Sequence, residues 1–379
     1  MAATFAAIPA NAAGPVLPEQ ARRQWAEGGA VLVSGVFPEE LIRKLRGDIR
    51  RISGERKTKF GRESALTFPS ESAALNEVTV HPRILVISTQ LLETKEIRLS
   101  QAEGWAKTGV TKEAFAKRDP REAHDQRVHC DYPNHTLAHP SAWESPDAVS
   151  FILYLSDYDD CAGGTAVVPR RGASDPAYAP TALTRTPGVL GAWINDREMA
   201  EARYAEGEEE VYRFRQQLYA REVYCKFKPG DLLVYRQDTW HRGTRVKAGV
   251  TRFVMNLTYR RQWAEWIGHW HPGWARKNYH IGWPHRRGLE ATIARLEPFQ
   301  RSVLGFPAPG HPYWNEYTLA AVAARYKGLG MDMAPYVDGY NKREQPAAAG
   351  SSGGAARVLA QQKQKQRQQQ QQQQGSSSA

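Results

Sequence analysis

Short apolar runs separated by glycine and proline turns dominate the middle of the chain. They span residues 30–34, 149–155, 165–168, 222–227, 232–235 and 251–259. Runs of this length, rich in Val, Leu, Phe and Tyr, are typical of β-strands. Few helical stretches separate them, so we predict an antiparallel barrel or jelly roll and a mainly β protein with flanking helices.

Helical periodicity marks the two ends of the chain and one insertion. Residues 18–28 predict a helix that stops at a glycine pair, and a second helix opens at Pro38 with Leu41, Ile42 and Leu45 on one stripe. Within an insertion at about 172–221, the charged segment Arg197–Leu218 predicts an exposed helix. From residue 262 to 340 the chain is again helical and rich in tryptophan.

We therefore expect one large domain over residues 18–340, after a flexible N-terminus at 1–17. The last segment, 345–379, runs through Ala, Gly and Ser into the glutamine tract Gln368–Gln374 and has almost nothing to bury. Such a composition predicts a disordered tail.

Charge and cysteine content narrow the class of protein. Of the formal net charge of +11, four positive charges lie in the acid-free segment after residue 350, which leaves +7 for the body. A moderately basic body suits anionic ligands. Three cysteines without Cys-x-x-Cys spacing are read as free thiols in a reducing compartment. Without a signal peptide or an apolar run long enough for a membrane, we expect a cytoplasmic protein, with organelle targeting left open.

Two short segments carry candidate metal ligands. His129 and Asp131 lie two residues apart, so on a strand their side chains would share one face. Alone, this pair is a weak signal, because such spacing arises by chance. His241 follows one apolar run, and Arg252 lies on the next. A turn near residues 246–248 would fold these runs into a hairpin and place His241 opposite Arg252.

Two histidines and one carboxylate form the facial triad of non-haem iron(II) oxygenases. Three protein ligands leave three positions, two for a keto acid and one for dioxygen. The distal carboxylate of the keto acid needs a planar cation, which arginine supplies. We expect Asp131 to have no partner other than the metal.

The sequence resembles the phytanoyl-CoA dioxygenase-like (PhyH) family of 2-oxoglutarate oxygenases over most of residues 20–340. Three segments carry the resemblance: 25–41, Gly163–Pro169, and Lys228 through the Trp240-His-Arg-Gly run to Arg252. It implies a double-stranded β-helix (jelly-roll, cupin-like) core, Fe(II) bound by His129, Asp131 and His241, and 2-oxoglutarate bound by Arg252. The family often has serine where this chain has Gly243, which puts one hydrogen bond to the co-substrate in doubt.

The resemblance implies a dioxygenase that uses Fe(II), 2-oxoglutarate and O2, and that hydroxylates a small organic molecule with release of succinate and CO2. Relatives that halogenate lack the carboxylate, so Asp131 favours hydroxylation or another two-electron oxidation. Lys107 and Gln101, on the strand predicted before the metal motif, are further candidates for binding 2-oxoglutarate. Candidates for the substrate pocket follow the metal motif directly: Tyr132, Asn134, His135 and Thr136.

Two alternatives stay open. Asn256-Leu-Thr-Tyr-Arg260 echoes a segment of the oxidative demethylases that act on nucleic acid. Their co-substrate arginine lies two residues before that asparagine, where this chain has Val254, so nucleic acid is the less favoured partner. The other alternative is a non-catalytic binding protein on the same fold, although such proteins usually lose one metal ligand. We expect no membrane partner. We expect a small substrate, and an anionic one would suit the positive net charge of the body.

Overall fold

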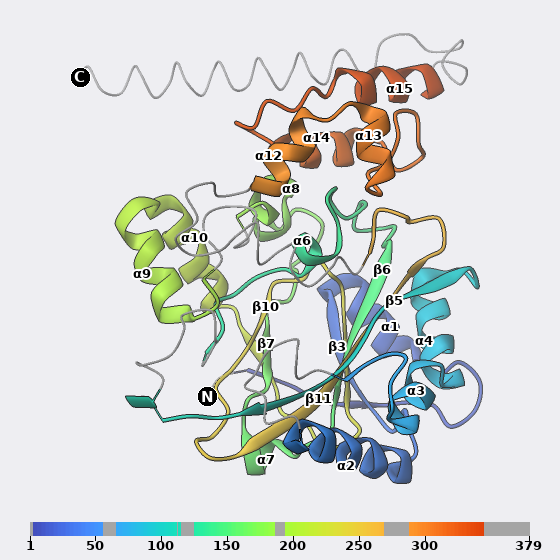
Figure 1. The fold of residues 1–379 in the computed structure, drawn as a ribbon, viewed down its shortest axis with the longest axis vertical. Helices are drawn as coiled ribbons and strands as arrows, with labels where there is room; N and C mark the ends of the chain where they lie inside the picture. The colour runs from blue at the N-terminus through green and yellow to red at the C-terminus, as the bar shows by residue number, and fades with distance from the viewer. Residues whose placement is uncertain are drawn as a thin grey trace.

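The computed structural model describes residues 3–55, 66–111, 113–114, 125–185, 194–268 and 288–344. Within these residues the strands form two sheets (Figure 1). The larger sheet has, in spatial order, β2 (Ile8–Pro9), β3 (Ala30–Ser34), β9 (Leu232–Tyr235), β6 (Ala148–Tyr154), β11 (Thr251–Arg261), β5 (Ile97–Thr108) and β4 (Leu66–Thr67). The smaller has β1 (Thr4–Phe5), β8 (Val223–Cys225), β7 (Thr165–Val167) and β10 (His241–Gly243).

Strand β11 shows how the larger sheet separates a helix-covered face from a cavity. Phe253, Met255 and Leu257 are buried in a core shared with helices on one side of the sheet. Because side chains alternate along a strand, the intervening Arg252 and Val254 point to the opposite face, where they line a cavity. The helices on the covered face are α1 (Glu19–Gly28), α2 (Glu39–Glu55), α3 (Ala73–Thr79) and α4 (Pro82–Leu92) (Figure 1).

A second apolar cluster fills the space between the two sheets. Tyr154 and Leu233 of the larger sheet pack there with Val167 and Cys225 of the smaller one. Two sheets closed over a shared core, with helices on the outside, confirm the predicted jelly-roll core.

Of the remaining helices, two short ones lie after the metal motif and after β6, and the others lie in the insertion and near the C-terminal end of the described chain (Figure 1). In chain order, these remaining helices are α6 (Tyr132–His135), α7 (Tyr158–Cys161), η2 (Pro176–Tyr178), α8 (Pro180–Leu183), α9 (Arg197–Gly207), α10 (Glu209–Tyr219), α12 (Gly288–Arg295), α13 (Pro298–Val303), α14 (Glu316–Arg325) and α15 (Ala334–Glu344). Helix α14 begins at a reciprocal cap, where Asn315 accepts from the backbone of Thr318 at 2.9 Å. No helix in the described part of the chain is long and apolar enough to cross a membrane.

Two local predictions differ from the structure. The segment Arg197–Leu218 forms two helices, because α9 ends at Gly207 and α10 begins at Glu209. Residues 1–17 were predicted to be flexible, yet Thr4–Phe5 pairs with β8, Ile8–Pro9 pairs with β3, and Val16 and Leu17 are buried. The predicted tail at 345–379 lies outside the described residues.

The predicted hairpin between the strands of His241 and Arg252 is wrong. Strand β6 lies between β9 and β11, so these two strands are not neighbours. After Tyr235 the chain crosses to the smaller sheet, where His241 pairs with Val167, while Arg252 pairs with Lys107 of β5. Sequence spacing did not reveal this crossing, because the intervening strand comes from a distant part of the chain.

Candidate metal and co-substrate site

His129 and His241 are held side by side by backbone hydrogen bonds. The amide of His129 donates to the carbonyl of His241 at 2.9 Å, and the reverse bond is 2.8 Å. The two imidazole rings lie 4.5 Å apart between centroids. His241 belongs to β10, and His129 forms an isolated antiparallel bridge on its other side. Two segments more than a hundred residues apart in sequence therefore present histidines from adjacent positions.

The hydrogen bonds of the two rings define which nitrogen is available. Nδ1 of His129 lies 3.0 Å from the carbonyl of Arg127, and Nδ1 of His241 lies 2.9 Å from the carbonyl of Thr239. A carbonyl only accepts, so each Nδ1 donates, which leaves Nε2 as the nitrogen of each ring that is available to a metal. Burial, and then the charges of Arg127 and His241, lower the pKa of His129 to about 4, which keeps its imidazole neutral at physiological pH.

Asp131 completes the cluster from the start of a short helix. Its Oδ1 lies 3.5 Å from Nε2 of His129, and its Oδ2 lies 3.5 Å from Nε2 of His241. Burial alone would raise the pKa of Asp131, but the two histidines hold it below its usual range, so the carboxylate is ionised. Asp131 has helical backbone angles at the N-cap of α6, so the predicted strand from His129 to Asp131 ends before the carboxylate.

Asp131 has a partner that the sequence did not reveal. The hydroxyl of Tyr235 donates to its Oδ2 at 2.7 Å, so the expectation of a carboxylate with no partner but a metal is wrong. Tyr235 is the last residue of β9, where an aromatic reads equally well as part of the core. The bond fixes the orientation of the carboxylate, as residues behind a metal ligand commonly do.

The cluster fits a first-row transition metal. One ligand atom from each of the three residues lies within 4.8 Å of the others, the one such group of His, Cys, Asp or Glu found among the described residues. Ligands at about 2.1 Å from one ion are themselves roughly 3–4 Å apart. Two neutral imidazoles and one carboxylate on a single side leave the opposite side open for other ligands.

Arg252 and the two weaker co-substrate candidates share a cavity with the triad. The cavity has a volume of about 230 Å³, and Gln101, Lys107 and Arg252 all line it. Burial, and then the charge of Arg252, lower the pKa of Lys107 to about 7. Arg252 donates through Nη1 to the carbonyl of Gly163, and its buried Nε has no hydrogen-bond partner among the described residues. The predicted grouping of His241 and Arg252 in one cavity holds, although the hairpin that motivated it does not.

The four residues predicted to line the substrate pocket differ in where the structure places them. His135 lines the cavity. Tyr132 is not among the lining residues: its hydroxyl donates to the carbonyl of Leu183 at 3.1 Å. Thr136 accepts from the amide of Ala138 at 3.0 Å and is also absent from the lining. The chain winds into α6 after Asp131 instead of continuing extended, which turns these two side chains away. The side chain of Asn134 lies outside the described part of the structure.

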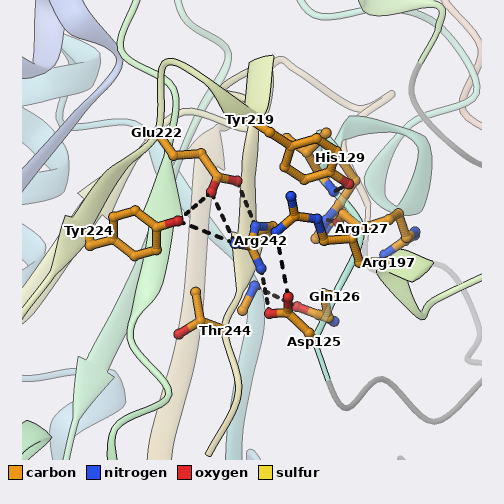
Figure 2. A network of polar contacts seen from close by, with 12 residues as sticks. Asp125, Gln126, Arg127, His129, Arg197, Tyr219, Glu222, Tyr224, Arg242 and Thr244 are labelled. Carbon is orange, nitrogen blue, oxygen red and sulfur yellow. Dashed lines mark hydrogen bonds and ion pairs between the residues drawn. The ribbon is translucent and has the colours of Figure 1, made fainter. Parts of the chain in front are cut away.

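A buried ion-pair network holds the segment that carries His129 (Figure 2). Arg242, directly after His241, pairs with Glu222 at 2.6 Å and with Asp125. Asp125 begins the stretch that leads through Gln126 and Arg127 to His129. Figure 2 shows the Arg242 guanidinium between the two carboxylates, with the Tyr224 hydroxyl beside Glu222. The network thereby ties the two histidine-bearing segments together through side chains.

Several polar residues of the cavity were not found from the sequence. Gln126, Arg127 and Asn195 line it, as does Asn256, which the sequence indicated only as part of the segment similar to the demethylases. Gln126 and Arg127 precede the metal motif closely enough to have been candidates, since residue 127 lies two positions before His129 and shares its face on an extended chain. Asn195 gave no such signal, because it lies in the insertion.

Comparisons with known proteins place the chain in a family. The family model for phytanoyl-CoA dioxygenase (PhyH) matches residues 25–254, more than half of the chain. A search of curated proteins gave no match. One similar solved structure is the non-heme alpha ketoglutarate dependent carbocyclase SnoK from nogalamycin biosynthesis, at 15% identity, covering 65% of this chain and 87% of SnoK, with a TM-score of 0.44.

Two other solved structures are similar to a comparable degree. Iron-bound HygX from Streptomyces hygroscopicus is 14% identical, with 67% of this chain and 90% of HygX covered and a TM-score of 0.43. EctD from S. alaskensis with bound Fe is 13% identical, with 66% of this chain and 78% of EctD covered and a TM-score of 0.44. Structural similarity at this level does not assign a function. The assignment of the family rests on the match to its sequence model, together with the His-Asp-His cluster. The chain belongs to the phytanoyl-CoA dioxygenase (PhyH) family and is an Fe(II)- and 2-oxoglutarate-dependent dioxygenase.

Proposed function

We propose that this enzyme hydroxylates a small organic molecule, with His129, Asp131 and His241 binding the Fe(II). The observation that carries the proposal is the convergence of one ligand atom from each of His129, Asp131 and His241 within 4.8 Å, in the cavity that Arg252 also lines. When bound, Fe(II) supplies the activation of dioxygen, and the reaction converts substrate, O2 and 2-oxoglutarate into hydroxylated product, succinate and CO2. One oxygen atom of O2 goes to the product and the other to succinate.

Arg252 is proposed to bind the distal carboxylate of 2-oxoglutarate, assisted by Lys107 and Gln101. A guanidinium fork matches a carboxylate in two parallel hydrogen bonds, and burial strengthens such a pair. Its Nε, which has no partner within the described part of the chain, is a donor that such a ligand would use. Lys107 is the cross-strand neighbour of Arg252, so its ammonium adds a second charge at the same end of the cavity. A bound dianion there would keep Lys107 protonated.

The cavity has room for a small molecule or for a single group of a larger one. Its volume of about 230 Å³ lies below the roughly 300–1,000 Å³ typical of ligand pockets. Val254, at the position where the demethylases of nucleic acid have their arginine, lines the cavity with an apolar side chain. Neither observation favours nucleic acid as the substrate.

We also infer that residues 18–340 form the oxygenase domain, with the tail at 345–379 dispensable. The family match at 25–254 lies within these bounds, and helices α12, α14 and α15 share a buried cluster with Ala148 of β6 and with Leu137 and Ala138 after the metal motif. Deletion of 345–379 is expected to leave turnover and melting temperature nearly unchanged.

The proposed function is tested with purified protein, Fe(II), 2-oxoglutarate and a panel of small metabolites under ¹⁸O2. The expected result is substrate-stimulated succinate formation matched one to one by a product that has gained one ¹⁸O atom. The Asp131→Ala protein is the control and should form no succinate above background. Stoichiometric succinate with a product that has lost two hydrogens and gained no oxygen would replace hydroxylation by another two-electron oxidation. No succinate with any compound and no uncoupled 2-oxoglutarate consumption would favour a non-catalytic binding protein.

A further inference from the structure

Two helices of the insertion hold the backbone next to the metal ligand His129. On one side, His129 exchanges backbone hydrogen bonds with His241. In an extended chain the polar groups of the preceding residue point the other way, so those of Val128 need partners on the opposite side. Helix α10 supplies them: the Val128 amide donates to the Tyr219 hydroxyl at 3.0 Å, and the Val128 carbonyl accepts from Nη2 of Arg215 at 3.1 Å.

Glu201 of α9 fixes both of these side chains. Its Oε1 accepts from the Tyr219 hydroxyl at 2.8 Å and from Nε of Arg215, also at 2.8 Å. The Arg215 side chain is fully buried and that of Glu201 is 11% exposed, so solvent hardly weakens the ion pair between them. The two side chains of α10 therefore reach Val128 in one fixed arrangement.

The ring of Tyr219 also packs on the ion-pair network behind the two histidines (Figure 2). The guanidinium carbon of Arg197 lies 4.0 Å from the ring centroid, and that of Arg242 lies 5.6 Å from it. Arg242 directly follows His241 and pairs with Asp125. The insertion is therefore in contact with the segments of both histidine ligands.

We propose that Arg215 and Tyr219 are positioning residues for the iron ligand His129, and that iron binding stabilises α9 and α10 in turn. A ligand that is held in its binding geometry before the metal arrives binds the metal more tightly. Coupling between two sites is reciprocal, so the free energy that the helices contribute to iron binding is also the free energy that iron contributes to their order. The inference rests on the proposed function, because it takes His129 as an iron ligand. It makes the insertion at 172–221 a part of the metal site.

The first test measures the dissociation constant of Fe(II) for the full-length protein, by competition with a chelator and without oxygen. Tyr219→Phe keeps the ring that packs on Arg197 and removes the hydroxyl, so the Val128 amide loses its acceptor. The affinity for Fe(II) should fall about tenfold, as for other residues behind metal ligands. Tyr212→Phe, at the other tyrosine of α10, is the control and should stay within about twofold of wild type. Glu201→Gln keeps the shape of that side chain and loses its charge, so it should lie between the two.

The second test uses the unaltered protein, so it applies even if Tyr219→Phe does not fold. Hydrogen exchange of the backbone amides is compared with and without Fe(II), in the absence of oxygen. The amides of α9 and α10 should exchange at least about threefold more slowly with iron, whereas those of α2, on the covered face of the larger sheet, should change less. In folded Tyr219→Phe this selective slowing should be smaller.

Two results would overturn the inference: a dissociation constant in Tyr219→Phe no weaker than in Tyr212→Phe, or no greater slowing by iron in α9 and α10 than in α2. Neither result affects the proposed function, as long as wild type binds Fe(II) and Asp131→Ala does not. If wild type binds no more Fe(II) than Asp131→Ala, the proposed function fails, and the inference fails with it.

Discussion

The two walls of the cavity are built differently. One wall is regular sheet, in which β5, β6 and β11 pair along their length and present Lys107, Ile152 and Arg252. The other is irregular, formed by residues 125–131 and 194–196, and carries Arg127, His129 and Asp131. In the first wall, backbone ladders fix where each side chain points. In the second, isolated backbone hydrogen bonds, such as the pair between His129 and His241, are supplemented by side-chain contacts such as the Arg242 ion pairs.

This difference separates two kinds of sensitivity to mutation. A change on the sheet wall should remove only the function of the altered side chain, because the ladder holds its neighbours in register. A change in the contacts behind the irregular wall should disturb ligands that it does not touch. The four predictions below run from the largest expected effect to the smallest.

The largest effect is expected for Asp131→Ala. The variant should lose stoichiometric iron, measured by metal analysis after purification with Fe(II), because two neutral imidazoles alone hold the ion weakly. Its folding should change less, although the Tyr235 hydroxyl loses its acceptor. Tyr235→Phe is the matched control: it keeps all three ligands and should weaken iron binding by only about 10- to 100-fold. Normal iron content and turnover in Asp131→Ala would contradict the assignment of His129, Asp131 and His241 as the metal ligands.

The second prediction concerns the sheet wall. Arg252→Ala should raise the apparent Michaelis constant for 2-oxoglutarate by tens- to thousands-fold, because loss of one partner of a buried charge pair costs roughly 2–5 kcal/mol. Iron binding should stay intact. Arg252→Lys should fall between, since lysine keeps the charge and loses the fork. The measurement is a 2-oxoglutarate titration of succinate release at saturating iron. An unchanged constant in Arg252→Ala would exclude the residue from co-substrate binding.

The sequence predicted the sheet wall better than the irregular one. A run of β-favouring residues located the strand of Arg252, and the residue types together with the resemblance to a family located the triad. The pairing partner of Arg252 is Lys107, from a strand far upstream, and no local pattern revealed it. Around Asp131 the prediction failed in detail, because extended spacing was assumed where a helix begins, and because the contact with Tyr235 spans 104 positions. Contacts between distant segments depend on the whole fold, which single-sequence patterns do not encode.

The third prediction tests the irregular wall through a residue that lines no part of the cavity. Asp125→Asn weakens the ion pair with Arg242 and, at 3.7 Å, the one with Arg197. Because Asp125 anchors the segment that leads to His129, iron affinity should fall about tenfold, as for other residues behind metal ligands. Affinity for 2-oxoglutarate should fall less. Both are measured on the same preparation, iron by chelator competition and 2-oxoglutarate by anaerobic calorimetry.

Asp159→Asn serves as the control for this variant, since Asp159 is 77% exposed in its pair with Lys228 and should contribute little. Equal losses of iron and 2-oxoglutarate affinity in Asp125→Asn would show that the two walls respond together, and the distinction between them would fail.

The smallest effect is expected at Gly243, where the two walls meet and the family often has serine. A Cβ at this position would lie 2.8 Å from Oε1 of Gln126, the atom that accepts a hydrogen bond from the Gly243 amide. The end of a glutamine side chain can rotate away, so Gly243→Ser should fold at a cost of about 1 kcal/mol, the usual value of one hydrogen bond. The Gln126 amide thus fills the space of the missing serine.

Gly243→Ser and Gly243→Ala together test whether the side-chain amide of Gln126 also replaces the hydrogen bond to 2-oxoglutarate that a serine at this position would make. Both variants displace Gln126, but only serine offers a hydroxyl. If Gln126 is an adequate substitute, 2-oxoglutarate affinity should stay within about threefold of wild type in the serine variant and fall somewhat further in the alanine variant. A tenfold gain in the serine variant alone would mean that this chain lacks a co-substrate contact its relatives have. The irregular wall would then have given up a contact for 2-oxoglutarate in order to hold Gln126 and, through Asn195, the guanidinium of Arg127.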